Sequence, residues 1–134
     1  MNRAKFIFCL LNLVFVFILI QFFVPLINEL FQGSELFLLP MAIFCLLGIL
    51  LIIFSRKIET KKKRYFMING FSAAGFLIFV ILHNVFYAFA ELSAEIIFLK
   101  TILEFMHGLF FIIGLIVCPL AFIVSSLIII IKKY

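Results

Sequence analysis

The chain has 134 residues, of which 68% are hydrophobic and 13% are charged, and its formal net charge is +5 at pH 7. Soluble globular domains are about half apolar and about a quarter charged, so this composition argues against a soluble fold and is typical of an integral membrane protein. The positive charge is not expected to serve nucleic-acid binding, because the basic residues form short clusters beside apolar segments.

Four apolar segments without a charged residue follow one another along the chain. They cover residues 6–27, 36–54, 65–88 and 108–131. Each is close to the ~20 residues that an α-helix needs to cross a bilayer, and a backbone in lipid must satisfy its own hydrogen bonds. We therefore predict an all-α fold, a four-helix transmembrane bundle that forms one domain over residues 1–134.

The first segment is expected to be a retained helix, although Arg3 and Lys5 precede it as they would precede a signal peptide. Its apolar run is longer than the core of a signal peptide, and no small-x-small cleavage site follows it. Pro25 ends this segment, and Pro40 falls in the first turns of the second, where a missing N–H costs little. The loop between them is short, so the two helices are expected to be antiparallel neighbours.

Basic residues gather on one side of the predicted membrane. Ten of the eleven Lys and Arg residues lie there: Arg3, Lys5, Arg56, Lys57, Lys61, Lys62, Lys63, Arg64, Lys132 and Lys133. Five of the six acidic residues lie on the other side, together with Lys100. Because Lys and Arg in short loops mark the cytoplasmic side, we expect a multi-pass protein of the cell membrane with both termini in the cytoplasm. The cluster Arg56–Arg64 is also expected to contact anionic lipid headgroups.

The third segment carries two adjacent polar residues, His83 and Asn84, and Tyr87 follows one turn later. At about 100° per residue, Asn84 shares a helix face with Gly70 and Ala74. Small residues at this spacing let membrane helices pack closely, so we predict that Asn84 lies in a packing face and bridges to a neighbouring helix.

His83 points in another direction and is an intramembrane candidate for function, because ionisable residues are costly in lipid. A structural histidine, bonded to a carbonyl, glutamine or tyrosine, is the alternative. Counting about 1.5 Å per residue from the inner boundary places His83 level with Gln21 and Gly114, and roughly 10 Å from the height of His107. Gln21 is therefore the expected hydrogen-bond partner.

The fourth segment has a stripe of small and polar residues that includes Gly114, Cys118 and Ser125. Such a stripe either packs against another helix or lines a polar path. Pro119 interrupts it, removes one backbone hydrogen bond and frees a carbonyl near Leu115. We predict a kink there, with a hinge as the alternative.

The segment 91–107 is too polar to span a membrane and too apolar for a free loop, so we predict an amphipathic helix at the outer interface or an extension of the last span. Its polar residues with Glu91 form an outer-face cluster: Glu91, Glu95, Glu104 and His107. Glu104-x-x-His107 has the spacing that di-iron bundle proteins use in two copies. Glu91, Glu104 and His107 are therefore metal-ligand candidates, although a single copy favours an interfacial ion pair. No cofactor is predicted.

The three cysteines, Cys9, Cys45 and Cys118, all lie inside apolar segments and form no Cys-x-x-Cys pair. We interpret them as small buried apolar residues, which disfavours a membrane thiol oxidoreductase. The chain has no Gly-rich phosphate loop and no His-Glu-x-x-His motif. No catalytic residue can be assigned.

Two stretches, LHNVFYAF at 82–89 and VCPLAFIV at 117–124, resemble segments of small four-span membrane proteins of bacteria and archaea that have no assigned function. The resemblance covers the third and fourth apolar segments only. It implies a four-span protein and no activity. The chain departs from small multidrug exporters, which have a glutamate in their first helix, and from quinone-linked thiol oxidases, which have a cysteine pair.

Three functions stay open at this point. The first is a non-enzymatic membrane protein of assembly, accessory or regulatory type, which acts as a homo-oligomer or with a membrane partner. The second is a small oligomeric transporter or channel with a polar path along the fourth segment, gated by His83 or His107. The third is a membrane protein that binds a metal or cofactor at its outer face. An enzyme is less expected than any of these.

Overall fold

The computed structural model describes residues 3–31, 33–58 and 61–132, and every regular element in these ranges is a helix. In chain order they are α1 (Arg3–Phe23), α2 (Pro25–Phe31), the 3₁₀ turn η1 (Glu35–Phe37), α3 (Leu39–Ser55), α4 (Lys62–Leu92), α5 (Ile97–Ile112), the π-helical turn η2 (Ile113–Val117) and α6 (Cys118–Ile131). The expected all-helical class is confirmed. Two parts of the predicted basic side, Lys133 and positions 59–60, lie outside the described residues.

Three helices are long and apolar enough to cross a membrane: α1, α4 and the continuous helix made by α5, η2 and α6. The last of these has 35 residues, because the segment expected to be amphipathic continues directly into the fourth span. Helix α3, which corresponds to the second apolar segment, has 17 residues. It is shorter than the ~20 residues of a full span.

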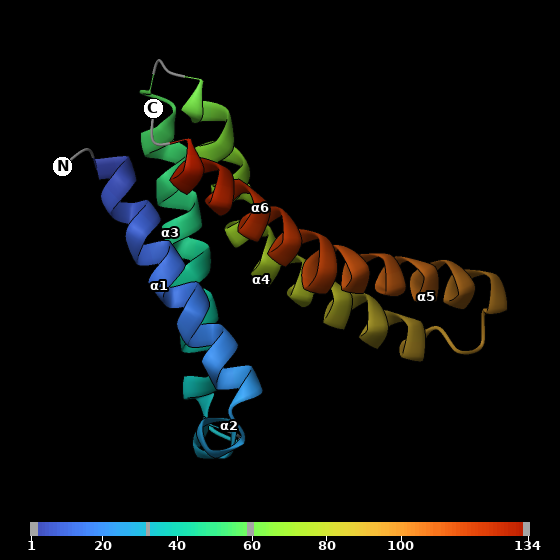
Figure 1. Cartoon of the computed structure of the whole chain (residues 1–134). Coiled ribbons are helices and arrows are strands. Elements are labelled where there is room, and N and C mark those ends of the chain that lie inside the picture. The colour runs from blue at the N-terminus through green and yellow to red at the C-terminus, as the bar shows by residue number, and fades with distance from the viewer. Residues whose placement is uncertain (1–2, 32, 59–60, 133–134) are drawn as a thin grey trace.

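The helices form an open V rather than a closed bundle (Figure 1). Helices α1 and α3 run together along one side, whereas the second half of α4 and α5 diverge from them as a two-helix hairpin. We call residues 77–113 the hairpin arm. We call α1, α3, α6 and residues 62–76 of α4 the core region.

Both described chain ends lie at the end of the V where α3 connects to α4 (Figure 1). The Arg3 guanidinium lies 5.8 Å from the centre of the Phe54 ring. At the other terminus, Lys132 Nζ donates to the Tyr65 hydroxyl at 3.2 Å. The basic residues that flank the helices therefore gather at one end of the molecule.

Glycines bring the backbones of α3 and α4 into contact in the core region. A Cβ atom added to Gly48 would lie 2.8 Å from the carbonyl oxygen of Gly70, and one added to Gly70 would lie 2.8 Å from that of Gly48. Side chains at these positions would separate the helices. Around this contact the aromatic rings of Phe44, Phe76 and Phe122 fill the centre of the core.

The predicted kink at Pro119 takes the form of a π-helical turn just before it. Proline has no N–H to donate to the carbonyl four residues earlier, at Leu115. In the turn η2 the hydrogen bonds lengthen by one residue, and Cys118 N–H donates to the carbonyl of Ile113. The turn places Gly114 against α4, where an added Cβ would lie 3.1 Å from Cβ of Phe79.

Candidate functional site

The two histidines of the chain meet between α4 and α5. Their rings stack with centres 4.0 Å apart and planes at 23°. His83 Nδ1 lies 3.1 Å from the carbonyl oxygen of His107, and His107 Nδ1 lies 3.2 Å from that of His83. A carbonyl oxygen only accepts hydrogen bonds, so both Nδ1 atoms must carry hydrogen and donate. In the neutral rings, both Nε2 atoms then keep a free lone pair.

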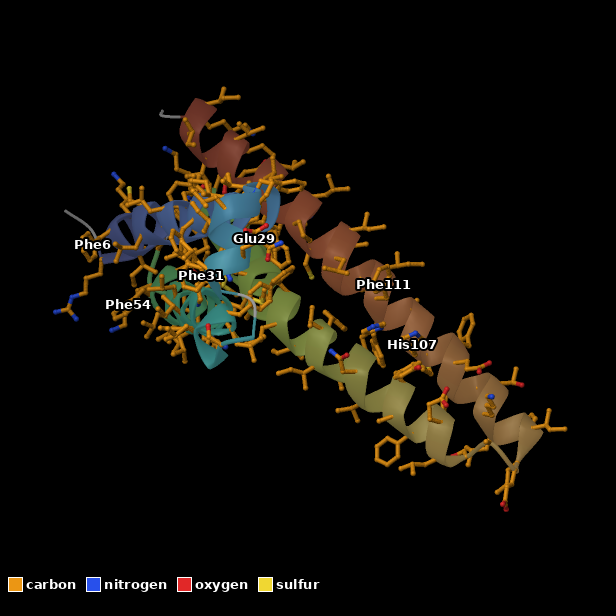
Figure 2. The ribbon with its side chains drawn as sticks, turned by 90° about the horizontal axis from the view of Figure 1, so that it is seen from below. Phe6, Glu29, Phe31, Phe54, His107 and Phe111 are labelled. Atoms are coloured by element: carbon orange, nitrogen blue, oxygen red, sulfur yellow. The ribbon has the colours of Figure 1, made fainter. Side chains whose placement is uncertain are left out.

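Aromatic rings cover the histidine pair on both outer faces. Phe111 lies 5.2 Å from the His83 ring, and Tyr87 lies 5.2 Å from the His107 ring. These two outer rings are tilted by 48° and 43° against the histidine rings beside them, and Figure 2 labels His107 and Phe111 on α5. Tyr87, predicted as a polar intramembrane candidate, thus lies beside His107 with its own side chain exposed.

The predicted partner of His83 is wrong. Gln21 is buried, and its Nε2 donates to the carbonyl of Phe37 at 3.1 Å, in the connection before α3. The estimated difference in height between His83 and His107 is also wrong, because the two rings are in contact and the count began at the inner ends of the two helices, far from the pair. Counting from the hairpin turn finds the pair, since each histidine lies twelve residues from Glu95.

The predicted bridging role of Asn84 is wrong as well. Asn84 is exposed, and its Nδ2 donates to the carbonyl of Val80 in its own helix at 2.8 Å. The face that it shares with Gly70 and Ala74 is buried only at those small residues, where Gly70 contacts Gly48 of α3.

A different asparagine makes the predicted bridge. Asn69 is fully buried, and its Nδ2 lies 2.7 Å from Ser126 Oγ, 3.0 Å from Ser125 Oγ and 3.2 Å from the carbonyl oxygen of Phe122. Its Oδ1 has no hydrogen-bond partner within the described residues. The sequence signal was its position directly before Gly70, at the start of the small-residue stretch NGFSAAG.

The small and polar stripe of the fourth segment lies against α4. Gly114, Cys118 and Ser125 are all buried, and Pro119 beside them is half-buried. Cys118 Sγ would lie 3.2 Å from a Cβ atom added to Gly75, and Ser125 bonds to Asn69. The stripe is therefore a helix-packing surface in this chain.

The acidic residues of the outer-face cluster lie apart from the histidine pair. Glu104 pairs with Lys100 at 3.7 Å in an exposed contact, and Glu91 and Glu95 are exposed near the hairpin turn. Within the described ranges, no three His, Cys, Asp or Glu side chains lie close enough to hold a metal ion. Glu91, Glu104 and His107, the three metal-ligand candidates, are thus not brought together.

Two adjoining clefts open inside the V. The larger has a volume of about 390 Å³ and is lined mainly by phenylalanines of α1, α3, α4 and α6. The smaller, about 250 Å³, shares Phe22, Phe76 and Leu115 with it, and His83 and Asn84 lie in its wall. The histidine pair therefore borders an apolar space between the core region and the hairpin arm.

Comparisons of the chain with protein-family models, with curated proteins and with solved structures found no match. The chemistry of the site is accordingly argued from its own geometry.

Proposed function

We propose that this chain is a four-span integral membrane protein of the cell membrane that acts by assembling with other membrane-embedded helices. In this proposal α3 is the second span. Its 17 residues equal the shortest length, about 17 residues, at which a helix crosses a bilayer. Both termini lie in the cytoplasm, which is supported by the basic residues gathered at one end of the V. The Arg56–Arg64 cluster contacts anionic headgroups there.

The observation that carries the assembly proposal is the lack of burial in the hairpin arm. Ala90 is the one buried hydrophobic residue among residues 77–113, and no residue of α5 is buried. Helices associate in membranes by close packing and hydrogen bonds, and the two helices of the arm have such contacts mainly with each other. The apolar clefts beside the arm, with their phenylalanine walls, are the surface where large side chains of a further helix fit.

Photo-crosslinking tests this proposal with a matched pair of leucines. Leu19 lines the larger cleft and is 38% exposed, whereas Leu50 on α3 is 41% exposed and lines neither cleft. A photoreactive residue at position 19, in native membranes, is expected to give a protein adduct of defined mass, and the same residue at position 50 is expected to label lipid. Two differently tagged copies show whether the adduct is a second copy of the chain. Lipid adducts alone at both positions would contradict assembly through the cleft.

A polar transport path along the fourth segment has less support. Its small and polar residues Gly114, Cys118 and Ser125 are buried against α4, which leaves them unavailable to a passing ion or solute. A metal-binding function at the outer face also has less support, because the three candidate ligands, Glu91, Glu104 and His107, are not brought together within the described residues.

A further inference from the structure

The smaller cleft combines an aromatic wall with one polar edge. Its volume is about 250 Å³, and His83 and Asn84 are its polar lining residues. The aromatic wall consists of five phenylalanines: Phe22, Phe37, Phe76, Phe110 and Phe111. Small-molecule sites are typically concave and apolar, with a few polar groups that fix the orientation of the ligand. A cavity of about 150 Å³ already holds benzene, so this cleft has room for a substituted ring.

His83 provides a hydrogen-bond acceptor in the wall of this cleft. Its Nδ1 lies 3.1 Å from the carbonyl oxygen of His107 and donates to it, so its Nε2 keeps a lone pair. This Nε2 makes no hydrogen bond to the described part of the chain. The other ring of the pair, His107, does not line the cleft. The ring nitrogen left for a ligand is therefore Nε2 of His83.

Asn84 provides a donor directly beside this acceptor. Its Nδ2 gives one hydrogen to the carbonyl of Val80 at 2.8 Å, and the amide keeps a second hydrogen. A hydroxyl group both donates and accepts, so it matches an imidazole acceptor next to an amide donor. A ketone only accepts. An ammonium group only donates, and its charge would enter a wall that has no acidic side chain.

The phenylalanine wall favours an aromatic ligand over an aliphatic one. Aromatic rings that meet offset or edge to face stabilise a contact beyond the area that they bury. Phe111 lies 5.2 Å from the His83 ring, between ring centres, so the aromatic wall begins beside the acceptor. A hydroxyl group carried on an aromatic ring therefore fits both parts of the cleft.

We propose that the smaller cleft binds a phenolic ring of a membrane-soluble molecule, whose hydroxyl donates to His83 Nε2 and accepts from the amide of Asn84. The ring packs among the phenylalanines, and an apolar chain on it leaves through the open side of the V (Figure 1). No covalent bond changes. The proposal does not rest on the assembly function, because Leu19, where the further helix is expected, lines the larger cleft and not the smaller one.

Histidine ¹⁵N NMR tests the contact at the atom that makes it. The chain contains two histidines, so ¹⁵N-histidine protein in lipid nanodiscs gives two Nε2 signals, which His107→Phe assigns. The probe is para-pentylphenol, and pentylbenzene is its match without the hydroxyl. Above about pH 8, where imidazole is neutral, the phenol is expected to shift the His83 Nε2 signal saturably and far more than pentylbenzene does. Equal shifts with the two probes, or no shift, would overturn the proposal.

Affinities of matched variants separate this hydrogen bond from the structural role of His83. His83→Phe removes the acceptor, whereas His107→Phe removes the other ring of the pair and its Nδ1 bond at a position outside the cleft. Relative to pentylbenzene, the phenol is expected to bind about fivefold more weakly to His83→Phe. The ratio of the two affinities is expected to stay at its unmodified value in His107→Phe. An unchanged ratio in His83→Phe would overturn the proposal.

A third probe and a photoreactive phenol test the aromatic wall. Corrected for partition into empty nanodiscs, para-pentylcyclohexanol is expected to bind about fivefold more weakly than para-pentylphenol; equal affinity would overturn the aromatic assignment. The photoreactive phenol is expected to label residues within 76–84 and 110–115, and para-pentylphenol is expected to compete. Labelling confined to other segments would overturn the proposal. These outcomes are separate from the crosslink at Leu19, so either proposal can fail alone.

Discussion

The core region and the hairpin arm share helix α4 but are held together by different means. Seven of the eight buried residues of α4 precede position 77, and they contact α3 and α6 through glycine, alanine and asparagine. Beyond that position the helix presents rings to α5, and the histidine pair joins the two helices. The same helix therefore has a half that packs through small residues and a half that contacts α5 through aromatic rings and the histidine pair.

The difference is one of side-chain size and chemistry. Small residues let helix backbones touch, so any added volume in the core region must move a whole helix. Between α4 and α5, rings of histidine and phenylalanine meet instead, and each histidine also places a ring nitrogen on a backbone carbonyl of the opposite helix. We therefore expect the core region to be sensitive to added volume and the hairpin arm to be sensitive to the loss of the histidine contacts, and four substitutions test this contrast.

The largest effect is expected for Gly70→Ala. The new Cβ would lie 2.8 Å from the carbonyl oxygen of Gly48 and 2.8 Å from a side-chain atom of Ile52, and we expect a loss of about 2 to 3 kcal/mol of stability from this overpacking. Chemical unfolding in micelles, followed by circular dichroism, measures it. Gly108→Ala is the control, since nothing lies within 4 Å of its added Cβ; we expect it to be neutral or stabilising by up to about 1 kcal/mol. Equal losses in the two variants would contradict the contrast.

The second effect compares two asparagines on α4. Asn69→Ala removes the bonds to Ser125, Ser126 and the carbonyl of Phe122, and we expect a loss of about 1 to 2 kcal/mol. Asn84→Ala removes a bond within its own helix at an exposed site, and we expect a change within about 0.5 kcal/mol. The same unfolding assay compares them. A larger loss for Asn84→Ala would mean that this side chain has a partner outside the chain.

Much of the fold could be predicted from the sequence, because long uncharged apolar runs in lipid have few alternatives to the helix. For the segment 91–107 the sequence left two alternatives, a separate amphipathic helix or an extension of the last span, and the structure has the extension from Ile97 onward, in one helix that continues to Ile131. Lys100 and Glu104 pair on the surface of that helix. A charged pair spaced by four residues is compatible with a helix, so polarity alone did not mark its boundary.

The site could be predicted only in part. His83 and His107 were identified as candidates from their residue type, but their contact was missed because their heights were counted from the inner ends of the helices and not from the hairpin turn, where Glu95 lies twelve residues from each. Asn69 was overlooked because it lies among small residues, where packing explained the stretch without it. Ser125, by contrast, was placed correctly on the polar stripe by helical periodicity alone, since neighbours on one helix face need no tertiary information.

The third effect is confined to the hairpin arm. His107→Phe keeps a ring in the stack but removes its hydrogen bond to the carbonyl of His83 and leaves His83 without its stacked imidazole. Above about pH 8 we expect arm amides to open more easily by about 1 kcal/mol, with core amides unchanged. Hydrogen exchange measured by mass spectrometry resolves the two regions. Tyr87→Phe is the control, because it keeps the outer ring of the stack and is expected to leave exchange unchanged. Faster exchange throughout the core would show that the pair stabilises the whole molecule.

The smallest effect is expected for Glu104→Gln. The pair of Glu104 with Lys100 is an exposed contact within one helix, and such pairs contribute about 0.3 to 0.5 kcal/mol at most. We therefore expect a change in stability within about 0.5 kcal/mol in the same unfolding assay. A clearly larger loss would show that the Glu104 carboxylate has a further partner besides Lys100, because the exposed pair alone is too weak to account for it.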